Sequence, residues 1–379
     1  MKNFTRNLVL VGCIGSSACA APFCAIGDNA ELFVTGQAGV RFDDNILLAP
    51  SGPSKKSDTI FSLTPGLELD FGKDSLLKGV LSASESFNNY LNHSELNSQL
   101  LTVNLKAAYS TEKTKLAANA AYAQSDQNSY AANGSNIRRN TYSAGLNGEH
   151  AVSEKTSFGT GVTFSRTEYL QSGSVGEKDY GVPVNVYYGI TPKTDLSAGV
   201  TYGRSDLDNG LSYDDFYYNV GARGEFTPKL SGNFSIGWDD RTGSGGPGAQ
   251  NNSSLGFRSG LAYAYSEKTT FSLNADKGFT NASTGNSTQK NLGIILGAET
   301  ALSVSWKLNS SLTYRNIQYE GVAAAGRVDD YLEASLGLTY VVNSNVSLNG
   351  AYTYRNLSSN VPTVEFGNNI LAVSVSARY

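Results

Sequence analysis

The chain has 379 residues, with 40 glycines, 22 tyrosines and 16 phenylalanines, and a formal net charge of −4. After a short apolar run near its start, no apolar stretch approaches the ~20 residues that a membrane-spanning helix requires, which excludes a helical membrane protein. The chain also shows neither helical periodicity nor the continuous apolar strands of α/β folds. A hairpin of ~40 residues repeats instead, a period typical of a propeller, a solenoid or a barrel.

Residues 1–20 have the pattern of a secretory signal peptide. Lys2 and Arg6 provide a basic start, residues 8–14 form an apolar run, and Ala18-Cys19-Ala20 is a small-x-small cleavage site. We therefore expect cleavage before Ala21.

All three cysteines of the chain lie in or just after this segment. An alternative interpretation takes residues 10–13 as a lipoprotein box with an acylated Cys13, but the apolar run before that cysteine would be very short. Cys13 and Cys19 lie inside the predicted signal, so Cys24 alone remains, in a short N-terminal tail at residues 21–30. A disulfide framework and a cysteine-based metal site are thereby excluded.

The first predicted strand, residues 31–43, alternates with a period of two. Its apolar face carries Val34 and Phe42, and its polar face carries Gln37 and Arg41. Period-two alternation places these sets on opposite faces of a strand. Apolar-out, polar-in alternation is typical of a strand that lies between lipid and a watery lumen.

The same alternation continues through the following strands. Residues 59–72 form the second strand after a polar loop at 44–57, and Pro65 within it predicts a bulge because proline removes a ladder hydrogen bond. Residues 76–91 and 98–110 form the third and fourth strands.

Short turns and longer loops then alternate regularly along the chain. Short turns are expected at residues 73–75, 111–114, 151–156, 191–194, 227–229, 266–268, 302–305 and 343–345. Longer polar loops are expected at 126–139, 168–178, 206–212, 243–252, 281–287, 320–328 and 358–366. All short connections fall on one side, as in outer-membrane barrels with short periplasmic turns and longer extracellular loops. We therefore predict an antiparallel up-and-down barrel of about eighteen strands over residues 31–379.

The last stretch, residues 367–379, reads as the closing strand of the barrel. Apolar side chains occupy one face up to the terminal aromatic residue, and the other face is mostly polar. This pattern resembles the signal that the barrel-assembly machinery reads, and its residues are Leu371, Val373, Val375, Ala377 and Tyr379. Tyr instead of Phe at the end, and Ala377 where an aromatic is usual, depart from the commonest form of that signal.

Aromatic residues on the apolar faces lie near strand ends, where amphipathic rings favour the headgroup level of a membrane. They predict two girdles and comprise Tyr109, Tyr142, Phe164, Tyr202, Trp238, Tyr263, Tyr265, Trp306, Tyr314, Tyr340, Tyr352 and Tyr354. In a soluble sandwich they would form a core, but the sequence offers no second apolar layer for them to pack against.

Charged residues of both signs occupy the alternate strand positions that face the lumen. This placement is expected because a charge that faces lipid is costly at the membrane midplane. We expect the pore lining to comprise Arg41, Glu68, Asp70, Lys106, Arg223, Glu225, Arg258, Asp276, Glu299, Arg315, Glu333, Arg355 and Arg378, with Asp43 and Glu149 on the same face. These charges either form a salt-bridged wall or tune the selectivity of a passage, and we favour a combination.

Among these charges, Arg315 and Arg355 stand in the near-repeats Tyr-Arg-Asn at 314–316 and 354–356. They are the best candidates for contact with an anionic solute or polymer. Arg166 and Arg204 share the outward face instead, and we expect them to reach lipid headgroups.

Two segments resemble a known family. Residues 39–45, Gly-Val-Arg-Phe-Asp-Asp-Asn, are followed by Ser-Asp-Thr at 57–59 and Leu-Thr-Pro-Gly-Leu at 63–67. This opening is similar to that of the "putative beta-barrel porin 2" family of outer-membrane proteins. The resemblance covers the first two strands and implies an outer-membrane porin fold.

No catalytic or cofactor constellation is visible in the sequence. His93 is predicted in an outer loop and His150 beside a periplasmic turn, so neither lies with a nucleophile and an orienting group at membrane depth. Residues 243–248 are glycine-rich but lack the strand-loop-helix context of a phosphate cradle. We expect no enzyme activity, no cofactor, no bound metal and no nucleic-acid partner.

Paired acids lie at the predicted outer strand ends, at 43–44, 214–215, 239–240 and 329–330. They are interpreted as solvated rim charge, or alternatively as ligands for divalent cations that bridge lipopolysaccharide.

The sequence supports two classes of function. A barrel of about eighteen strands is wide enough for an aqueous channel unless something fills it, and no loop is long enough for an inserted plug, although adjacent loops could cap the mouth. We expect a bacterial outer-membrane channel that passes small hydrophilic solutes or a saccharide polymer through a mixed-charge lumen. The alternative is a structural or surface-interaction barrel. The expected partners are outer-membrane lipid, lipopolysaccharide and the barrel-assembly machinery.

Overall fold

The computed structural model describes residues 22–50, 54–126, 136–171, 173–246, 249–282, 287–321 and 326–379. The predicted signal peptide, residues 1–20, lies outside these residues, as do parts of the loops predicted at 44–57, 126–139, 168–178, 243–252, 281–287 and 320–328. No helix in the described ranges is long and apolar enough to cross a membrane.

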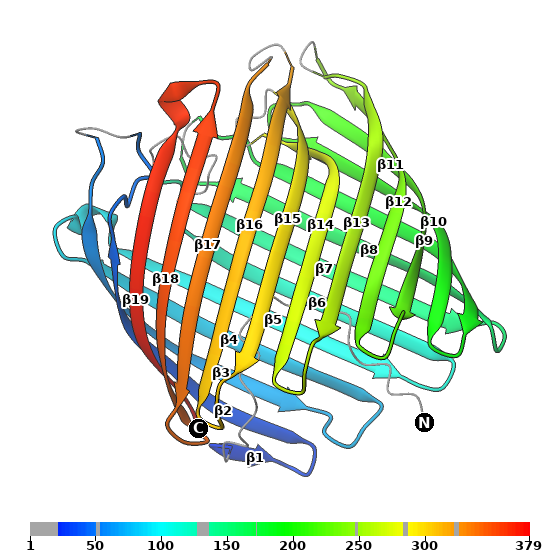
Figure 1. Cartoon of the computed structure of the whole chain (residues 1–379), viewed down its shortest axis with the longest axis horizontal. Helices are drawn as coiled ribbons and strands as arrows, with labels where there is room; N and C mark the ends of the chain where they lie inside the picture. Colours follow the sequence, from blue (N-terminus) through cyan, green and yellow to red (C-terminus); the bar gives the residue numbers. More distant parts are fainter. Residues whose placement is uncertain are drawn as a thin grey trace.

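Eighteen antiparallel strands close into a barrel, as predicted (Figure 1). β19 pairs with β2, from Ile370 opposite Asp43 to Arg378 opposite Thr35, so the last strand joins the first. The first nine wall strands are β2 (Ala30–Asp43), β3 (Asp58–Phe71), β4 (Leu77–Tyr90), β5 (Ser98–Ser110), β6 (Thr114–Ser125), β7 (Arg139–Ala151), β8 (Thr156–Tyr169), β9 (Glu177–Thr191) and β10 (Thr194–Leu207). The other nine are β11 (Ser212–Glu225), β12 (Leu230–Ser244), β13 (Asn252–Ala264), β14 (Thr269–Asn281), β15 (Thr288–Ala301), β16 (Trp306–Glu320), β17 (Val328–Val341), β18 (Val346–Ser359) and β19 (Phe366–Arg378).

Alternation along each strand sorts side chains between lipid and lumen, as the sequence predicts. On β19, Leu371 and Val373 are 58% and 55% exposed on the outer face. On β3, Leu63 and Leu67 are exposed on the same outer face. Because these large apolar side chains face away from the lumen, the outer surface is suited to lipid.

The connections also follow the predicted asymmetry. Eight short turns lie at the end of the barrel where the C-terminus lies, and the longer loops lie at the opposite end (Figure 1). Two of the longer loops contain short 3-10 helices, η1 (Ser94–Leu96) and η2 (Pro362–Val364).

The bulge predicted at Pro65 is wrong. The register of β3 against β2 is constant across Gly36 and Pro65, and its register against β4 is the same on both sides of this position. Proline lacks one backbone donor, and here the strand tolerates that loss without inserting a residue.

The tail predicted at residues 21–30 contains a strand that the sequence analysis missed. β1 (Cys24–Ile26) pairs antiparallel with the start of β2, where Ala30 faces Ile26. Tyr379 also bonds to β2, through Val34, so β1 and the end of β19 share one edge of β2. Cys24 is a free, exposed thiol on this short strand.

Outward aromatic rings gather near both ends of the strands. Towards the extracellular loops, Phe164 and Tyr180 have ring centroids 5.3 Å apart, and Tyr202 and Phe216 are 5.2 Å apart. Towards the turns, Trp306 lies 4.7 Å from Tyr340. These positions agree with the two predicted girdles.

Most of the buried apolar side chains in the described residues lie at the extracellular mouth. Ile60, Ile317 and Leu357 are at most 1% exposed, and each belongs to the lumen face of its strand. The expectation of a mostly polar inner face therefore fails at this end, because loops fold over the strand ends and exclude water from these side chains.

Candidate functional site

The lumen contains two groups of ion pairs near the turn end. The first stands beside the seam between β19 and β2. Arg378 donates to Glu68 at 2.9 Å and to Asp70 at 2.9 Å, and its guanidinium lies 3.3 Å from the ring centroid of Phe33. β19 thereby contacts β3 across β2, which reinforces closure on the lumen side.

The second group stands on the opposite wall, around Arg223 of β11. Arg223 donates two bonds to Glu149, at 2.8 and 2.7 Å, and one to Asp195 at 3.0 Å. Its guanidinium also stacks 3.3 Å from the ring centroid of Tyr187. Bidentate pairing of this kind fixes geometry as well as charge, so the cluster braces β7, β9, β10 and β11 against one another.

The central part of the lumen carries charges that are less fully paired. Arg258 on β13 stands directly opposite Asp276 on β14, and Asp276 stands directly opposite Gly293 on β15. A Cβ added at Gly293 would lie 2.8 Å from Asp276 Oδ1 and 3.3 Å from Arg315 Nη1, so these two side chains lean over the same glycine. Within the described chain, neither Arg258 nor Arg315 has a carboxylate within ion-pair distance.

Arg355, the other predicted anion-binding arginine, has a different environment. It donates to Glu333 at 3.1 Å on the neighbouring strand. Arg315 instead stands opposite Tyr331. The two arginines that the sequence analysis grouped therefore differ in charge environment. Arg355 is neutralised by a neighbouring carboxylate, and Arg315 is not.

Four further predicted lining residues lie at varied depths. Lys106 is exposed on the lumen face of β5, and the Nε of Arg41 is buried without a hydrogen-bond partner in the described residues. Glu225 pairs with Lys193 of a turn and therefore belongs to the periplasmic rim. Glu299 lies near the turn end of β15.

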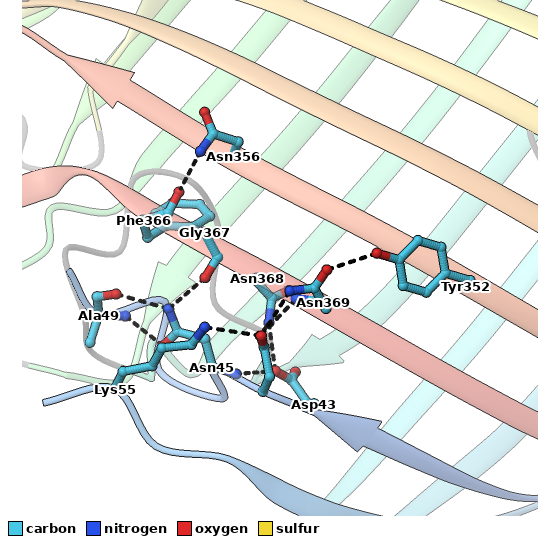
Figure 2. A network of polar contacts seen from close by, with 11 residues as sticks. Asp43, Asn45, Ala49, Lys55, Tyr352, Asn356, Phe366, Gly367, Asn368 and Asn369 are labelled. Atoms are coloured by element: carbon cyan, nitrogen blue, oxygen red, sulfur yellow. Dashed lines mark hydrogen bonds and ion pairs between the residues drawn. The ribbon is translucent and has the colours of Figure 1, made fainter. Parts of the chain in front are cut away.

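Loop 1, residues 44–57 between β2 and β3, is tied to β19 by the residues of the sequence motif (Figure 2). The fully buried side chain of Asn45 donates to the carbonyls of Ala49 at 2.8 Å and Gly367 at 3.0 Å, and it accepts from the Ala49 N–H at 2.9 Å. Asp43 accepts from Asn368 at 2.6 Å.

Asp44 completes this anchor. It accepts hydrogen bonds from the backbone N–H of Asn369 at 2.7 Å, from the side chain of Asn369 at 2.8 Å, and from the ammonium of Lys55 at 3.0 Å. Burial acts to raise the pKa of Asp44, but the bonds from Asn369 and Lys55 outweigh it and hold the pKa below its ordinary value.

The anchored loop turns into the mouth of the barrel. Leu48 adopts a positive φ of 48° and packs with Tyr331, Leu357 and Phe366 from the lumen faces of β17, β18 and β19. Val364 of η2 completes the cluster. The sequence analysis missed this contact because loop 1 shows no alternation that would place Leu48.

The paired acids at the outer strand ends are not simply solvated rim charge. Asp329 is fully buried and accepts from Arg327 at 2.6 Å. Asp215 holds the buried Arg241 at 2.6 Å, and Asp239 is 9% exposed. The solvated-rim interpretation is therefore wrong for Asp239 and Asp329, which were placed in water because their strand ends were taken to be open.

The outward arginines are also engaged by carboxylates. Arg166 donates to both oxygens of Asp208, at 2.8 and 3.1 Å, and Arg204 donates to Asp206 at 3.0 Å. His93 lies in an outer loop and His150 near a turn, as predicted, and their ring nitrogens contact Glu95 and Thr114.

Taken together, the closed antiparallel wall, the lipid-facing apolar surface and the polar lumen define a porin-type barrel. A family model described as "Putative beta-barrel porin 2" matches residues 22–379. The chain belongs to this family. It is accordingly an outer-membrane barrel, as the residues of loop 1 and of the first strands suggested.

Solved outer-membrane barrels resemble the fold at low sequence identity. OccAB4 of Acinetobacter baumannii has a TM-score of 0.49 and 12% identity, covering 93% of this chain and 98% of that one. OpdL of Pseudomonas aeruginosa has a TM-score of 0.48 and 13% identity, covering 93% and 99%. The outer membrane protein opdK of the same species has a TM-score of 0.49 and 11% identity, covering 92% and 99%. No curated protein matches the sequence.

Proposed function

We propose that this porin-family barrel is a passive outer-membrane channel for hydrophilic solutes, either small molecules or an extended saccharide polymer, and that it is not an enzyme. The observation that supports this most is solvent exposure inside a closed wall. Lys106, Asn119, Asn233 and Arg258 are exposed although they lie on the lumen face. Polar side chains inside a closed cylinder are exposed only where the interior holds water, and a barrel of this strand number has room for it.

The packing of the extracellular mouth suggests a second candidate function, that of a structural barrel without a passage. Loop 1 and the apolar cluster around Leu48 narrow the extracellular end, and a structural barrel would need no passage there. The exposed Lys106 and Arg258 inside the lumen favour the channel, because a structural barrel has no need of exposed lumen-facing charges.

Solute permeation separates the two candidates. Purified barrel in liposomes should allow swelling in isotonic arabinose or glucose, at a rate that falls as the solute grows. Liposomes with heat-denatured protein provide the control. Liposomes that hold the folded barrel and stay impermeable to every solute tested would support the structural barrel and contradict the channel.

For partners, we propose lipopolysaccharide at the extracellular girdle and the barrel-assembly machinery at the C-terminal strand. The outward ionic groups around Arg166 and Arg204 stand just above aromatic rings on the lipid face, at a level suited to lipid headgroups. Co-purified lipid A should be reduced in a barrel with both arginines changed to alanine.

A further inference from the structure

The lumen carries a second set of polar residues besides its charges. Away from the buried extracellular mouth, nine asparagines face inward, one on each of nine strands, and they are Asn104, Asn119, Asn147, Asn185, Asn219, Asn233, Asn274, Asn309 and Asn349. Asn119, Asn147, Asn233 and Asn309 are exposed to the interior. A primary amide is neutral and offers both donors and acceptors, so this set can bind solutes without selecting for charge.

Glycines face most of these asparagines across the ladder. Seven of the nine have a glycine directly opposite, in the pairs Asn119–Gly145, Asn147–Gly161, Asn185–Gly199, Asn219–Gly237, Asn233–Gly260, Asn274–Gly260 and Asn309–Gly337. Cross-strand partners on one face lie close enough for their side chains to meet. Each of these amides therefore has a neighbour without a side chain.

In three of these pairs the amide occupies the space that the glycine leaves. A Cβ added at Gly145 would lie 2.7 Å from Asn119 Oδ1, and one at Gly161 or Gly199 would overlap the Oδ1 of Asn147 or Asn185. These amides consequently lie flat on the wall. The arrangement leaves the bore wide while lining it with hydrogen-bonding groups.

One row of this lining runs around β8–β12. Asn185 stands between Gly159 and Gly199, and Asn219 stands between Gly199 and Gly237. The Asn219 nitrogen donates to the carbonyl of Gly199 at 3.2 Å and to that of Tyr217 at 3.4 Å, which orients its Oδ1 as the acceptor that a solute can reach.

Aromatic rings flank this row along the barrel axis, Tyr187 on the turn side and Tyr217 on the loop side, and both rings are covered by arginines. Arg223 lies 3.3 Å from the ring centroid of Tyr187, and Arg258 lies 4.3 Å from that of Tyr217. Arg223 is in turn neutralised by Glu149. The polar side chains of the row itself are thus the neutral, half-buried amides of Asn185 and Asn219.

We propose that this asparagine–glycine lining is a binding track for a neutral polyhydroxylated solute, a saccharide chain. The inference rests on the proposed channel function and names its substrate class. Hydroxyl groups donate and accept in the same way as the amides, so a sugar chain can exchange its water contacts for amide contacts at little cost as it moves. An anionic solute would gain no charge attraction from this row, because primary amides are neutral.

The test is block of single-channel current by maltohexaose in planar bilayers. Wild-type barrel should show concentration-dependent interruptions by the sugar. Asn185→Leu/Asn219→Leu should shorten their mean duration about tenfold, the effect expected from losing two neutral hydrogen bonds. Gly199→Ala should also shorten them, because its methyl group displaces the Asn185 amide while every amide is retained.

The matched control is Asn349→Leu. This asparagine also faces the lumen, but it stands opposite Thr339 and Ser374 instead of glycine and so lies outside the asparagine–glycine pairs of the track. Thr339 donates to its Oδ1 at 3.0 Å and its nitrogen donates to Ser376 at 3.3 Å, so its amide is already engaged. Its block durations should equal those of wild type. Heat-modifiable migration on gels confirms that each variant is folded.

The outcomes separate the two proposals. A conducting barrel that maltohexaose does not interrupt, or that it interrupts equally in wild type and in Asn185→Leu/Asn219→Leu, overturns the binding track and leaves the channel standing. A folded barrel without conductance overturns the channel, and the track with it.

Discussion

Charge in the centre of the lumen depends on how each arginine is paired. Arg355 is offset by Glu333, whereas no carboxylate of the described chain lies within ion-pair distance of Arg315, which leans with Asp276 over Gly293. Arg258 stands opposite Asp276 and also interacts with the charge of Asp239. We therefore expect an incompletely offset positive field around Arg315, which acts over a Debye length of ~8 Å at physiological salt.

Reversing Arg315 tests this field. Arg315→Glu should move the reversal potential across a salt gradient towards cation preference, more strongly at low salt because screening is weaker there. The matched control is Glu333→Gln/Arg355→Gln, which removes a neutral pair and should leave the potential almost unchanged. Equal shifts in the variant and the control would show that pairing does not determine selectivity.

Asp44 gives the loop 1 anchor a dependence on pH. Its pKa is lowered in the folded protein, so its contribution to stability is fully present above the unfolded value of ~3.9 and is lost as pH falls through the lower folded value. The single-channel current of the wild-type barrel should fluctuate little at pH 5–7 and more near pH 3, because protonation of Asp44 weakens the anchor that holds loop 1 at the mouth. Asp44→Asn should be noisy at both values, and a quiet Asp44→Asn channel would contradict the role of this anchor.

At the scale of elements, loop 1 packs into the extracellular mouth of the barrel. Leu48 is 4% exposed among side chains from three strands. Truncating a buried leucine commonly costs about 2–5 kcal/mol. Leu48→Ala should therefore release the loop and increase conductance fluctuations in single-channel records.

Leu91 provides the control for this variant. It lies in another extracellular loop and is 64% exposed, so Leu91→Ala removes the same atoms without opening a core. If Leu48→Ala and Leu91→Ala gave identical records, loop 1 would not restrict the mouth.

The terminal strand makes a separate prediction about assembly. Val375 faces lipid and is 43% exposed, so Val375→Asp should reduce the amount of heat-modifiable barrel in outer membranes. Ser376→Asp, one residue further on, faces the lumen and should be tolerated. Deleting Tyr379 should impair insertion as Val375→Asp does, and unchanged barrel levels would count against the assembly signal.

How well a feature could be predicted from the sequence depends on how far apart in the chain its interacting residues lie. Strand faces were predictable because a period of two is written in neighbouring residues, as at Leu371 and Val373. The packing of Leu48 against Leu357 was not, because it joins positions more than three hundred residues apart and loop 1 has no periodic pattern. Parity placed Arg315 and Arg355 inside, but the cross-strand register determined which of them met a carboxylate.

The asparagine–glycine lining was missed for a related reason. Each asparagine and its glycine lie on different strands, so their pairing becomes visible only when the register is known. The sequence analysis also considered the charged residues on the lumen face of each strand but not the neutral residues on the same face. An inward asparagine recurring from hairpin to hairpin was the signal in the sequence that could have revealed the lining.

At the scale of the whole molecule, the extracellular mouth and the turn-side part of the lumen are built from different kinds of side chain. The mouth is packed with apolar side chains and an anchored loop, and the turn-side part of the lumen is lined by flat amides and braced by ion pairs. Such a barrel should conduct ions continuously, at a level set by the mouth instead of the turn-side part of the lumen.

Single-channel recording of the purified wild-type barrel in a planar bilayer tests this account most directly. We predict discrete insertion steps of uniform size, each followed by sustained ion conductance, and larger open levels for Leu48→Ala. Folded, heat-modifiable barrel that inserts into the bilayer and carries no current, in wild type and in Leu48→Ala alike, would contradict the claim that the lumen is a water-filled passage.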